Sequence, residues 1–197
     1  MKTVNLVQLP NGERVNIVQS DCVLAGRHAD AVWVMLAWSS AAGEILQVSL
    51  QEIYANMVAG NAFLALRHED GCLVGYQTFG LWPEARIQEP RSKVVLPPYR
   101  QQGVGTVLSQ AILEYMVQQR PEWLVLALAS GGSVPIWKGK LGFVEVDQHL
   151  LPDCLWSICN LCANHAAALA AGKKCCAPAL VWPGNQRGQM LIEKSRK

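Results

Sequence analysis

Two glycines, Gly103 and Gly105, stand between an apolar segment and a strongly periodic one. Glycine takes left-handed backbone conformations and has no side chain, so the chain can turn sharply here and leave its peptide groups bare. The periodic segment predicts a helix, and the first N–H groups of a helix, here from about Gln101 to Thr106, have no partner within it. These groups and the helix dipole favour an anion, so the segment predicts a pyrophosphate site built from backbone. The periodic face consists of Val104, Val107, Leu108, Ala111, Ile112, Tyr115 and Met116.

The pattern Arg100-x-x-Gly-x-Gly is weak by itself, because average residue usage gives about one chance match in twenty chains of this length. Its context makes it stronger, since the turn follows an apolar strand and opens a regular helix. It is not a P-loop, because no Gly-Lys-Ser/Thr closes it, and it is not a dinucleotide-binding fingerprint, because residue 108 is Leu where a third glycine would stand.

Residues 94–108 resemble motif A of the GNAT acetyltransferases in their sequence V-V-L-P-P-Y-R-Q-Q-G-V-G-T-V-L, and residues 135–143 resemble motif B in P-I-W-K-G-K-L-G-F. The likeness covers about residues 62–147. It implies an α/β fold with a mixed, mostly antiparallel, splayed sheet flanked by helices. It also implies an N-acetyltransferase that moves an acetyl group from acetyl-CoA to an amine.

The resemblance assigns the cofactor contacts by matching position. Backbone groups of 94–96 would pair with the pantetheine, the turn would bind the pyrophosphate, and a helix at 133–138 would lie along the cofactor. The implied cofactor-binding residues are Val94, Val95, Leu96, Arg100, Gln101, Gln102, Gly103, Val104, Gly105, Thr106, Ser133 and Trp137.

An amine must lose its proton before it attacks a thioester, so this reaction calls for a base. The family often places a carboxylate about nine residues before the motif A arginine, where this chain has Arg91. Glu89 is the nearest carboxylate and is the predicted base, and Glu84 is a weaker candidate. The family's frequent acid, a tyrosine in motif B, is replaced here by Lys138. This replacement leaves open a GNAT scaffold that binds CoA as a sensor, without catalysis.

Five of the seven cysteines lie near the C-terminal end, with one histidine among them. Their spacing supplies enough soft ligands for a tetrahedral zinc site. Buried reduced thiols, an iron–sulfur cluster and a disulfide are the alternatives. We expect three of these residues on one helix over 155–171. The candidate ligands are Cys154, Cys159, Cys162, His165, Cys175 and Cys176.

Periodicity and turn residues divide the rest of the chain into strands and helices. Residues 29–41 are apolar nearly all round and predict a buried helix, and Ser49 with Glu52 predicts a capping box for the next one. Residues 81–91 predict a loop, because they contain Pro83 and Pro90. The predicted strands are 13–20, 63–68, 72–80, 92–96, 123–129 and 143–146, and the predicted helices are 29–41, 49–58, 103–119 and 133–141.

The domain organisation follows from these segments. We expect a GNAT domain over 1–147, which starts with a hairpin over about 1–20, and a cysteine-rich extension over 148–197. A last strand at 178–182 would complete the sheet. Helices 29–41 and 49–58 and the loop 81–91 would select the acceptor amine.

Composition limits the classes of partner. The 197 residues carry a net charge of +2, so nucleic acid is not an expected ligand of the whole chain. Residues 1–150 hold eleven Lys and Arg against thirteen Asp and Glu, whereas residues 151–197 hold six against two, so a zinc-stapled adaptor that binds protein or nucleic acid through a basic tail stays open. Without a secretory signal or an apolar run long enough to span a membrane, the expected location is cytoplasmic. A homodimer is compatible with all of this.

Overall fold

The computed structural model describes residues 3–43, 45–162 and 164–197, so the first two residues of the predicted N-terminal hairpin lie outside the described residues. The chain forms two compact units. The N-terminal unit comprises residues 1–80 and 90–115, and the C-terminal unit comprises residues 81–89 and 116–197. The domain boundary at 147 stays a prediction.

The described residues form eight strands, which are hydrogen-bonded in the order β1-β2-β3-β4-β5-β6-β8-β7. The β1–β2, β2–β3, β3–β4, β6–β8 and β7–β8 pairs are antiparallel, and β5–β6 is parallel. The predicted fold class, a mixed and mostly antiparallel sheet with helices, is therefore confirmed. The strands are β1 Thr3–Gln8, β2 Arg14–Gln19, β3 Ala62–Arg67, β4 Leu73–Trp82, β5 Ile87–Val95, β6 Leu124–Leu128, β7 Val144–Val146 and β8 Ala179–Val181.

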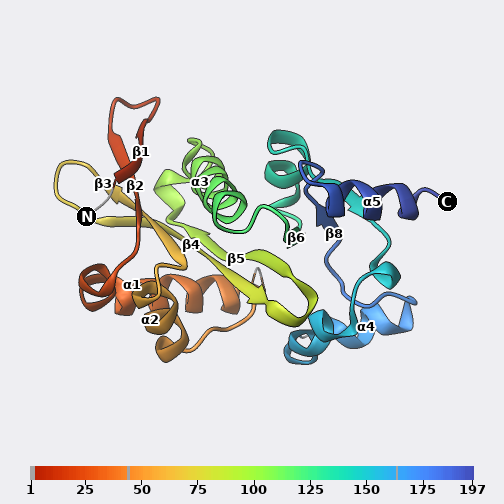
Figure 1. Ribbon diagram of the computed structural model, residues 1–197. Coiled ribbons are helices and arrows are strands. Elements are labelled where there is room, and N and C mark those ends of the chain that lie inside the picture. Colours follow the sequence, from red (N-terminus) through yellow and green to blue (C-terminus); the bar gives the residue numbers. More distant parts are fainter. Residues whose placement is uncertain (1–2, 44, 163) are drawn as a thin grey trace. The chain divides into compact units, whose positions relative to one another are not determined.

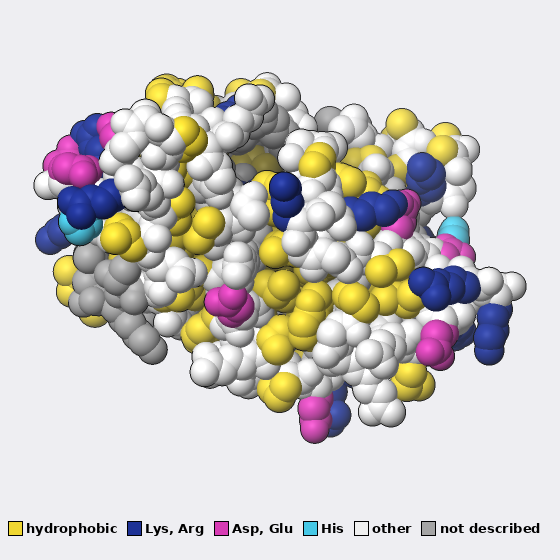
Figure 2. All heavy atoms as spheres, turned by 90° about the horizontal axis from the view of Figure 1, so that it is seen from above, with side chains coloured by type: hydrophobic (Ala, Val, Ile, Leu, Met, Phe, Trp, Pro, Cys, Tyr) yellow, Lys and Arg dark blue, Asp and Glu magenta, His cyan; other side chains and the backbone are white. Residues whose placement is uncertain are grey.

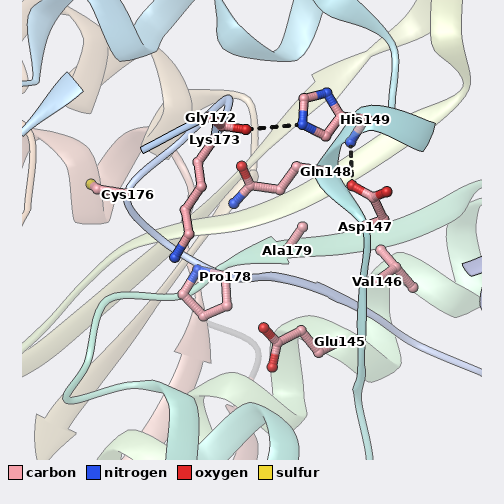
Figure 3. A pocket seen from close by; sticks show the side chains of 10 residues that line it. All are labelled: Glu145, Val146, Asp147, Gln148, His149, Gly172, Lys173, Cys176, Pro178 and Ala179. Atoms are coloured by element: carbon pink, nitrogen blue, oxygen red, sulfur yellow. Dashed lines mark hydrogen bonds between the residues drawn. The ribbon is translucent and has the colours of Figure 1, made fainter. Parts of the chain in front are cut away.

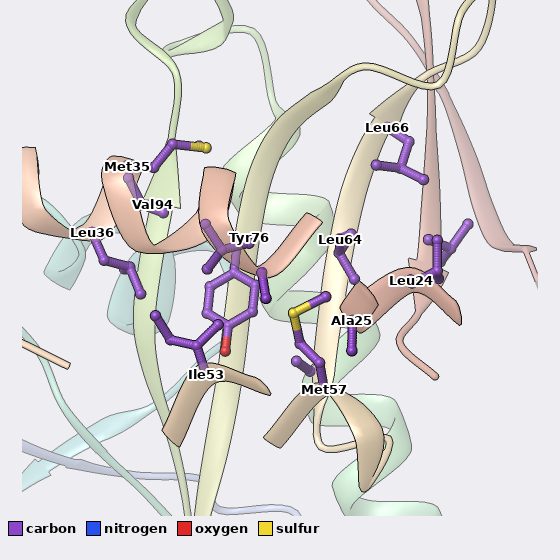
Figure 4. Packing of buried hydrophobic residues seen from close by; sticks show 14 residues of the cluster. Leu24, Ala25, Met35, Leu36, Ile53, Met57, Leu64, Leu66, Tyr76 and Val94 are labelled. Atoms are coloured by element: carbon purple, nitrogen blue, oxygen red, sulfur yellow. The ribbon is translucent and has the colours of Figure 1, made fainter. Parts of the chain in front are cut away.

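Helices cover both faces of the strands in the N-terminal unit (Figure 1). The helices α1 Cys22–Ala41 and α2 Leu50–Val58 pack on one face, where Ile53 and Leu64 are fully buried with Tyr76 (Figure 4). The helix α3 Val104–Gln119 lies on the other face, where its Tyr115 ring packs edge-to-face against Phe63. Because helices cover both faces of β3, nearly all of its residues are buried, whichever face of the sheet their side chains point to.

The first helix differs from the prediction. It begins at Cys22, not at residue 29, because Asp21 caps it and accepts a hydrogen bond from the Leu24 amide at 2.8 Å. Its side chains are not buried all round, since Trp33 and Trp38 are 40% and 67% exposed. Aromatic residues on the outer side make this amphipathic helix look uniformly apolar in the sequence.

The second helix matches its predicted bounds. The Ser49 hydroxyl accepts a hydrogen bond from the Glu52 amide at 3.1 Å, which confirms Ser49 as the N-cap. The Glu52 carboxylate lies 3.4 Å from the Arg91 guanidinium, a contact that the capping-box pattern does not anticipate. Gly60 follows the helix with a φ of +71°, as expected for a residue just past a C-cap.

The predicted loop over 81–91 is wrong, because most of it is strand. Strand β4 runs to Trp82, a 3-10 turn covers Pro83–Ala85, and β5 begins at Ile87. Parallel pairing to β6 fixes Gln88, whose side chain also donates to the carbonyls of Met116 and Arg120. The ladder to β6 ends before Pro90, so the missing N–H of the proline does not interrupt it.

The C-terminal unit is built around β8, which pairs with β6 on one side and β7 on the other. This confirms a last strand within the predicted range 178–182. The predicted helix at 133–141 is a short π-helix, Pro135–Lys140, and α5 Gln186–Ser195 follows the last strand. The remaining 3-10 turns are Pro97–Tyr99, Gln148–Leu150 and Asp153–Leu161.

The predicted helix over 155–171 is wrong. Residues Asp153–Leu161 form 3-10 turns, and only α4 His165–Ala170 is α-helical; residue 163 lies outside the described residues. One physical reason is a competing local hydrogen bond, because the Ser157 hydroxyl donates to the Cys154 carbonyl at 2.9 Å. The cysteines and the histidine therefore do not share one helical face.

Candidate acetyl-CoA site

The glycine turn lies between the end of β5 and the start of α3, within the N-terminal unit. Two residues with left-handed backbone, Gln101 with φ +60° and Gly103 with φ +92°, redirect the chain into the helix. A β-carbon at Gly103 would have no heavy atom within 4 Å, so the space above this residue is open. The Val104 side chain is fully buried and anchors the turn from below.

The start of α3 offers backbone donors at this turn. Residues 100–103 form a turn, α3 begins at Val104, and the first N–H groups of a helix have no acceptor within it. The amides of Thr106 and Val107 both donate to the Gly103 carbonyl, at 3.0 and 3.1 Å. The helix therefore starts with backbone donors and the positive end of its dipole, and this arrangement can bind a doubly charged phosphate group.

The end of β5 has an alternating hydrogen-bond pattern. The Leu96 amide donates to the Val74 carbonyl of β4 at 2.9 Å, so it is already used within the sheet. Alternate residues of a strand direct their peptide groups to opposite edges, so Val95 faces away from β4. The Val95 carbonyl accepts a hydrogen bond from Arg100 Nε at 3.0 Å. Arg100 thus braces the turn against the strand, and Gln102 donates to the Pro98 carbonyl.

The predicted cofactor contacts Ser133 and Trp137 belong to the C-terminal unit. The Ser133 hydroxyl donates to the Ser130 carbonyl at 3.0 Å and closes the turn before the π-helix. The Trp137 side chain is 3% exposed and packs edge-to-face on Phe143, with 5.1 Å between ring centroids. Trp137 therefore acts as a core residue of this unit.

The carboxylate predicted as the base is buried. Glu89 lies on β5 in the C-terminal unit, is 3% exposed, and accepts a hydrogen bond from Trp82 Nε1 at 3.3 Å. Glu84, the weaker candidate, is exposed. Burial raises the pKa of the nearby Cys154 thiol, and Glu84 adds to this shift. Lys138, at the place of the family's tyrosine, forms an exposed ion pair with Glu145.

A polar cluster on the α1–α2 face was missed in the sequence. It joins Glu52 of α2 and Arg91 of β5, whose side chains lie 3.4 Å apart, with Tyr76 of β4 close to both. Burial raises the pKa of the Tyr76 phenol well above its usual value. Gly80 makes room for Arg91, because a β-carbon there would lie 2.7 Å from the Arg91 Cζ. The signal available in the sequence is the two-residue period of a strand, which puts residues 76 and 80 on one face.

A second polar chain lies on the α3 face. Lys93 Nζ donates to the Ser109 hydroxyl at 3.1 Å, and Ser109 donates to Gln77 Oε1 at 3.0 Å. Ser109 and Gln77 are both buried, so the ammonium end of Lys93 is desolvated although the residue as a whole is only half-buried. This burial lowers the pKa of Lys93 from 10.5 to about 8.

An open cavity of about 550 Å³ lies between α1 and α2, in the region predicted to select the acceptor. Asp30 and Tyr54 are its polar side chains beside Gln51. Charged side chains are scattered over the face of the molecule shown in Figure 2, and no single-sign field stands out there. Among the described residues, no helix combines the length and apolarity needed to cross a membrane.

Similarity to known structures agrees with this geometry. The N-acetylglutamate synthase from Neisseria gonorrhoeae, solved with coenzyme A and N-acetyl-glutamate, is 17% identical with a TM-score of 0.61, over 85% of this chain and 34% of that one. This chain thus spans about a third of the length of that synthase. Rv2747 from Mycobacterium tuberculosis, solved with CoA and NLQ, is 14% identical with a TM-score of 0.62, over 84% of this chain and 96% of that one.

A third structure, the diaminobutyrate acetyltransferase EctA from Paenibacillus lautus with L-2,4-diaminobutyric acid and coenzyme A, is 14% identical with a TM-score of 0.54, over 72% of this chain and 88% of that one. At such identities these likenesses show a shared fold. No curated protein matches the chain at a significant level of sequence similarity. The sequence profile of the acetyltransferase (GNAT) family matches residues 32–143, more than half of the chain. The chain therefore belongs to the GNAT acetyltransferase family.

Proposed function

We propose that this protein transfers the acetyl group of acetyl-CoA to a primary amine. One observation carries the proposal: left-handed backbone at Gln101 and Gly103 leads into α3 at Val104, and the first N–H groups of a helix have no acceptor within it. A diphosphate has enough oxygen acceptors to use several of them, and hydrogen bonds to a charged group contribute about 1.5–3 kcal/mol each. The residues present therefore fit the pyrophosphate of coenzyme A without a basic patch.

The rest of the cofactor would follow the end of β5. The Val95 peptide group faces away from β4, so it is the group of the 94–96 segment best placed to pair with the amides of pantetheine. Leu96 contributes packing only, because its amide already donates to Val74. Arg100 keeps the strand end in place, because its Nε donates to the Val95 carbonyl.

In the transfer step, the neutral amine nitrogen attacks the thioester carbonyl, and the new N–C bond forms as the C–S bond breaks. The attacking nitrogen gives up one proton and keeps the other as the amide N–H, and the thiolate that leaves takes up one proton to become the thiol of CoA. We assign the role of general base to Glu89, directly or through one water. The absence of a motif B tyrosine is tolerable, because a thiolate is a good leaving group and positioning both reactants supplies several kcal/mol.

The acceptor would enter on the α1–α2 face of the N-terminal unit. The cavity between α1 and α2 is large enough for a small amine. Two of the similar structures hold amino-acid ligands, N-acetyl-glutamate and L-2,4-diaminobutyric acid, so amino acids belong in the first panel of acceptors.

Calorimetric titration with acetyl-CoA tests the binding site. Gly103→Trp places a side chain in the open space above the turn, and Gly71→Trp is its matched control, because Gly71 also has a positive φ and no heavy atom within 4 Å of a β-carbon. We expect Gly103→Trp to weaken binding at least about 100-fold, which is the loss of two charge-assisted hydrogen bonds. Gly71→Trp should bind like the wild type. Equal binding by the two variants would refute the glycine-turn site.

Product formation tests catalysis separately. The wild-type chain is incubated with acetyl-CoA and a panel of amines, and acetylated product is detected by mass spectrometry, because a thiol reagent would also report the protein's own cysteines. We expect one class of amine to be acetylated in the presence of the protein. Tight acetyl-CoA binding without any acetylated product would favour a CoA-binding scaffold and contradict the transferase proposal.

A further inference from the structure

Four cysteine thiols from two separate segments gather in the C-terminal unit. Cys159 and Cys162 flank the end of the Asp153–Leu161 turns, and Cys175 and Cys176 precede β8. The Cys162 and Cys176 sulfurs lie 3.8 Å apart. Cys159 and Cys175 are buried. We call these four residues the thiol cluster.

The electrostatics of the thiol cluster show that all four sulfurs interact. The pKa of Cys159 is raised to about 12, chiefly by burial and in addition by Cys175, Cys162 and Cys176. Burial likewise raises the pKa of Cys176 to about 11, with added contributions from Cys162 and Cys175. The sulfurs of the two segments therefore lie close enough to influence one another.

Backbone hydrogen bonds hold both segments in place. Gln148 Oε1 accepts from the amides of Lys174 and Cys175, and Gln148 Nε2 donates to the carbonyls of Cys175 and Ala177. Figure 3 shows Gln148 beside the segment that carries Cys176. The Ala177 amide donates to the Cys175 sulfur at 3.5 Å, a bond that would strengthen if the sulfur became a thiolate. On the other segment, the Cys162 amide donates to the Cys159 carbonyl at 2.9 Å.

The structure separates this cluster from the other two predicted ligands. Burial raises the pKa of Cys154, and Glu84 beside it adds to this, whereas His165 begins α4 and its amide donates to the Cys162 carbonyl at 3.0 Å. Lys173 and Lys174 precede the second cysteine pair in the sequence, and Lys174 forms an ion pair with Asp153 at 2.8 Å. Four sulfurs are the number that a closed, structural zinc site uses.

We propose that Cys159, Cys162, Cys175 and Cys176 bind one zinc ion as a structural site. A tetrahedral centre with Zn–S bonds of about 2.3 Å has sulfurs about 3.8 Å apart, which is the separation of Cys162 and Cys176. In the described residues no three His, Cys, Asp or Glu side chains are arranged as a ready metal site, so zinc must draw the other two sulfurs inward. Binding converts four thiols and Zn²⁺ into a tetrathiolate and four protons, with no change of oxidation state.

Such a site would have a structural purpose. The segment from Asp153 to Pro178 has 3-10 turns and one six-residue helix, and this provides few regular hydrogen bonds. A metal that joins its two ends would fix this segment against β8, in the way that small domains use zinc in place of a larger core.

The first test measures zinc in the full chain, purified with a reductant and passed through metal-free buffer. We expect one zinc per wild-type chain by elemental analysis. The double variant Cys162→Ser/Cys176→Ser should hold less than about a tenth of this, and the matched control Cys22→Ser/Cys72→Ser, which removes the two cysteines outside the C-terminal region, should keep one zinc. A wild-type chain that binds no zinc after reconstitution would overturn the proposal.

The second test uses only the wild type, so its result on zinc binding does not depend on whether a variant folds. Replacement of zinc by Co²⁺ should give the absorption of a tetrahedral cobalt–thiolate centre, and a chelator should abolish it and lower the melting temperature. Iron in anaerobically purified protein would identify a cluster, and a mass lower by two hydrogens would identify a Cys162–Cys176 disulfide; either result refutes the zinc site. Acetyl-CoA titration of the same samples keeps this outcome distinct from failure of the transferase proposal.

Discussion

Lys93 offers a sharp test of the electrostatics inside the N-terminal unit. Its ammonium group donates to the buried Ser109 hydroxyl, and burial lowers the pKa of Lys93 from 10.5 to about 8. The substitution Lys93→Met keeps an unbranched apolar stem and removes the charge. We therefore expect this variant to be more stable than the wild type at neutral pH, although it loses the hydrogen bond to Ser109.

The magnitude and the pH window follow from the two pKa values. Lowering the pKa of Lys93 from 10.5 to about 8 corresponds to at most about 3 kcal/mol, and partial exposure of the stem reduces the expected gain to about 1–3 kcal/mol. Below pH 8 the lysine is charged in both folded and unfolded chains, so the wild type carries the full penalty. Between pH 8 and 10.5 the folded chain loses the proton first, so the wild type gains stability with rising pH and the advantage of the variant disappears.

Urea denaturation at pH 7, 8, 9 and 10 measures this difference. The raised pKa values of Cys159 and Cys176 work in the opposite direction, because a folded chain that holds those protons longer loses stability as pH rises. Subtracting the wild-type curve from the variant curve cancels that contribution. The exposed lysine variant Lys140→Met should differ from the wild type by less than about 0.5 kcal/mol at each pH. A Lys93→Met difference that stays constant from pH 7 to pH 10 would refute the argument.

Two further predictions concern the base and the core. Glu89→Gln keeps an oxygen that can accept from Trp82 but cannot take a proton, so we expect kcat to fall about 10²–10⁴-fold while the Kd for acetyl-CoA stays within twofold; an unchanged kcat would exclude Glu89 as the base. Leu108→Ala empties a fully buried site where α3 packs against Gly75 of β4, so we expect a loss of about 2–5 kcal/mol in the free energy of unfolding; a loss below 1 kcal/mol by urea denaturation would contradict this packing.

Local signals in the sequence were enough for much of the fold. The α3 helix matches its prediction because its apolar face repeats at the helical period and Pro121 follows its end. The hairpin of β1 and β2 was predicted from Gly12 and its neighbours, and Gly12 takes the positive φ expected there. The prediction of a loop over 81–91 was wrong, because parallel pairing of Gln88 with β6 overrides the turn preference of the prolines. Such pairing depends on residues far along the chain.

Part of the candidate site could likewise be predicted from local sequence, and part could not. A backbone site for phosphate can be read from sequence, because it needs only glycine conformations and a helix start, both of which are local. The Glu52–Arg91 pair could not be predicted, because a helix and a strand bring together residues 39 positions apart. The thiol cluster is intermediate: spacing indicated a soft-metal site, but the expected helix was wrong, and only the fold selects four sulfurs from six candidates.

The acceptor amine is not selected by the glycine turn. The amides at residues 101–105 would recognise a phosphate in any chain with this turn, so they say nothing about which amine reacts. Selectivity must come from side chains that tertiary structure assembles, and the buried Tyr76 with Glu52 and Arg91 is such a group on the α1–α2 face. Arg91 and Glu52 contact each other in this structure. An amino acid that separates them would give its carboxylate to Arg91 and its ammonium group to Glu52, so both charges would stay paired. An alkylamine has no carboxylate, so it would leave Arg91 without an anion. Amino acids should therefore be better acceptors than alkylamines of the same size.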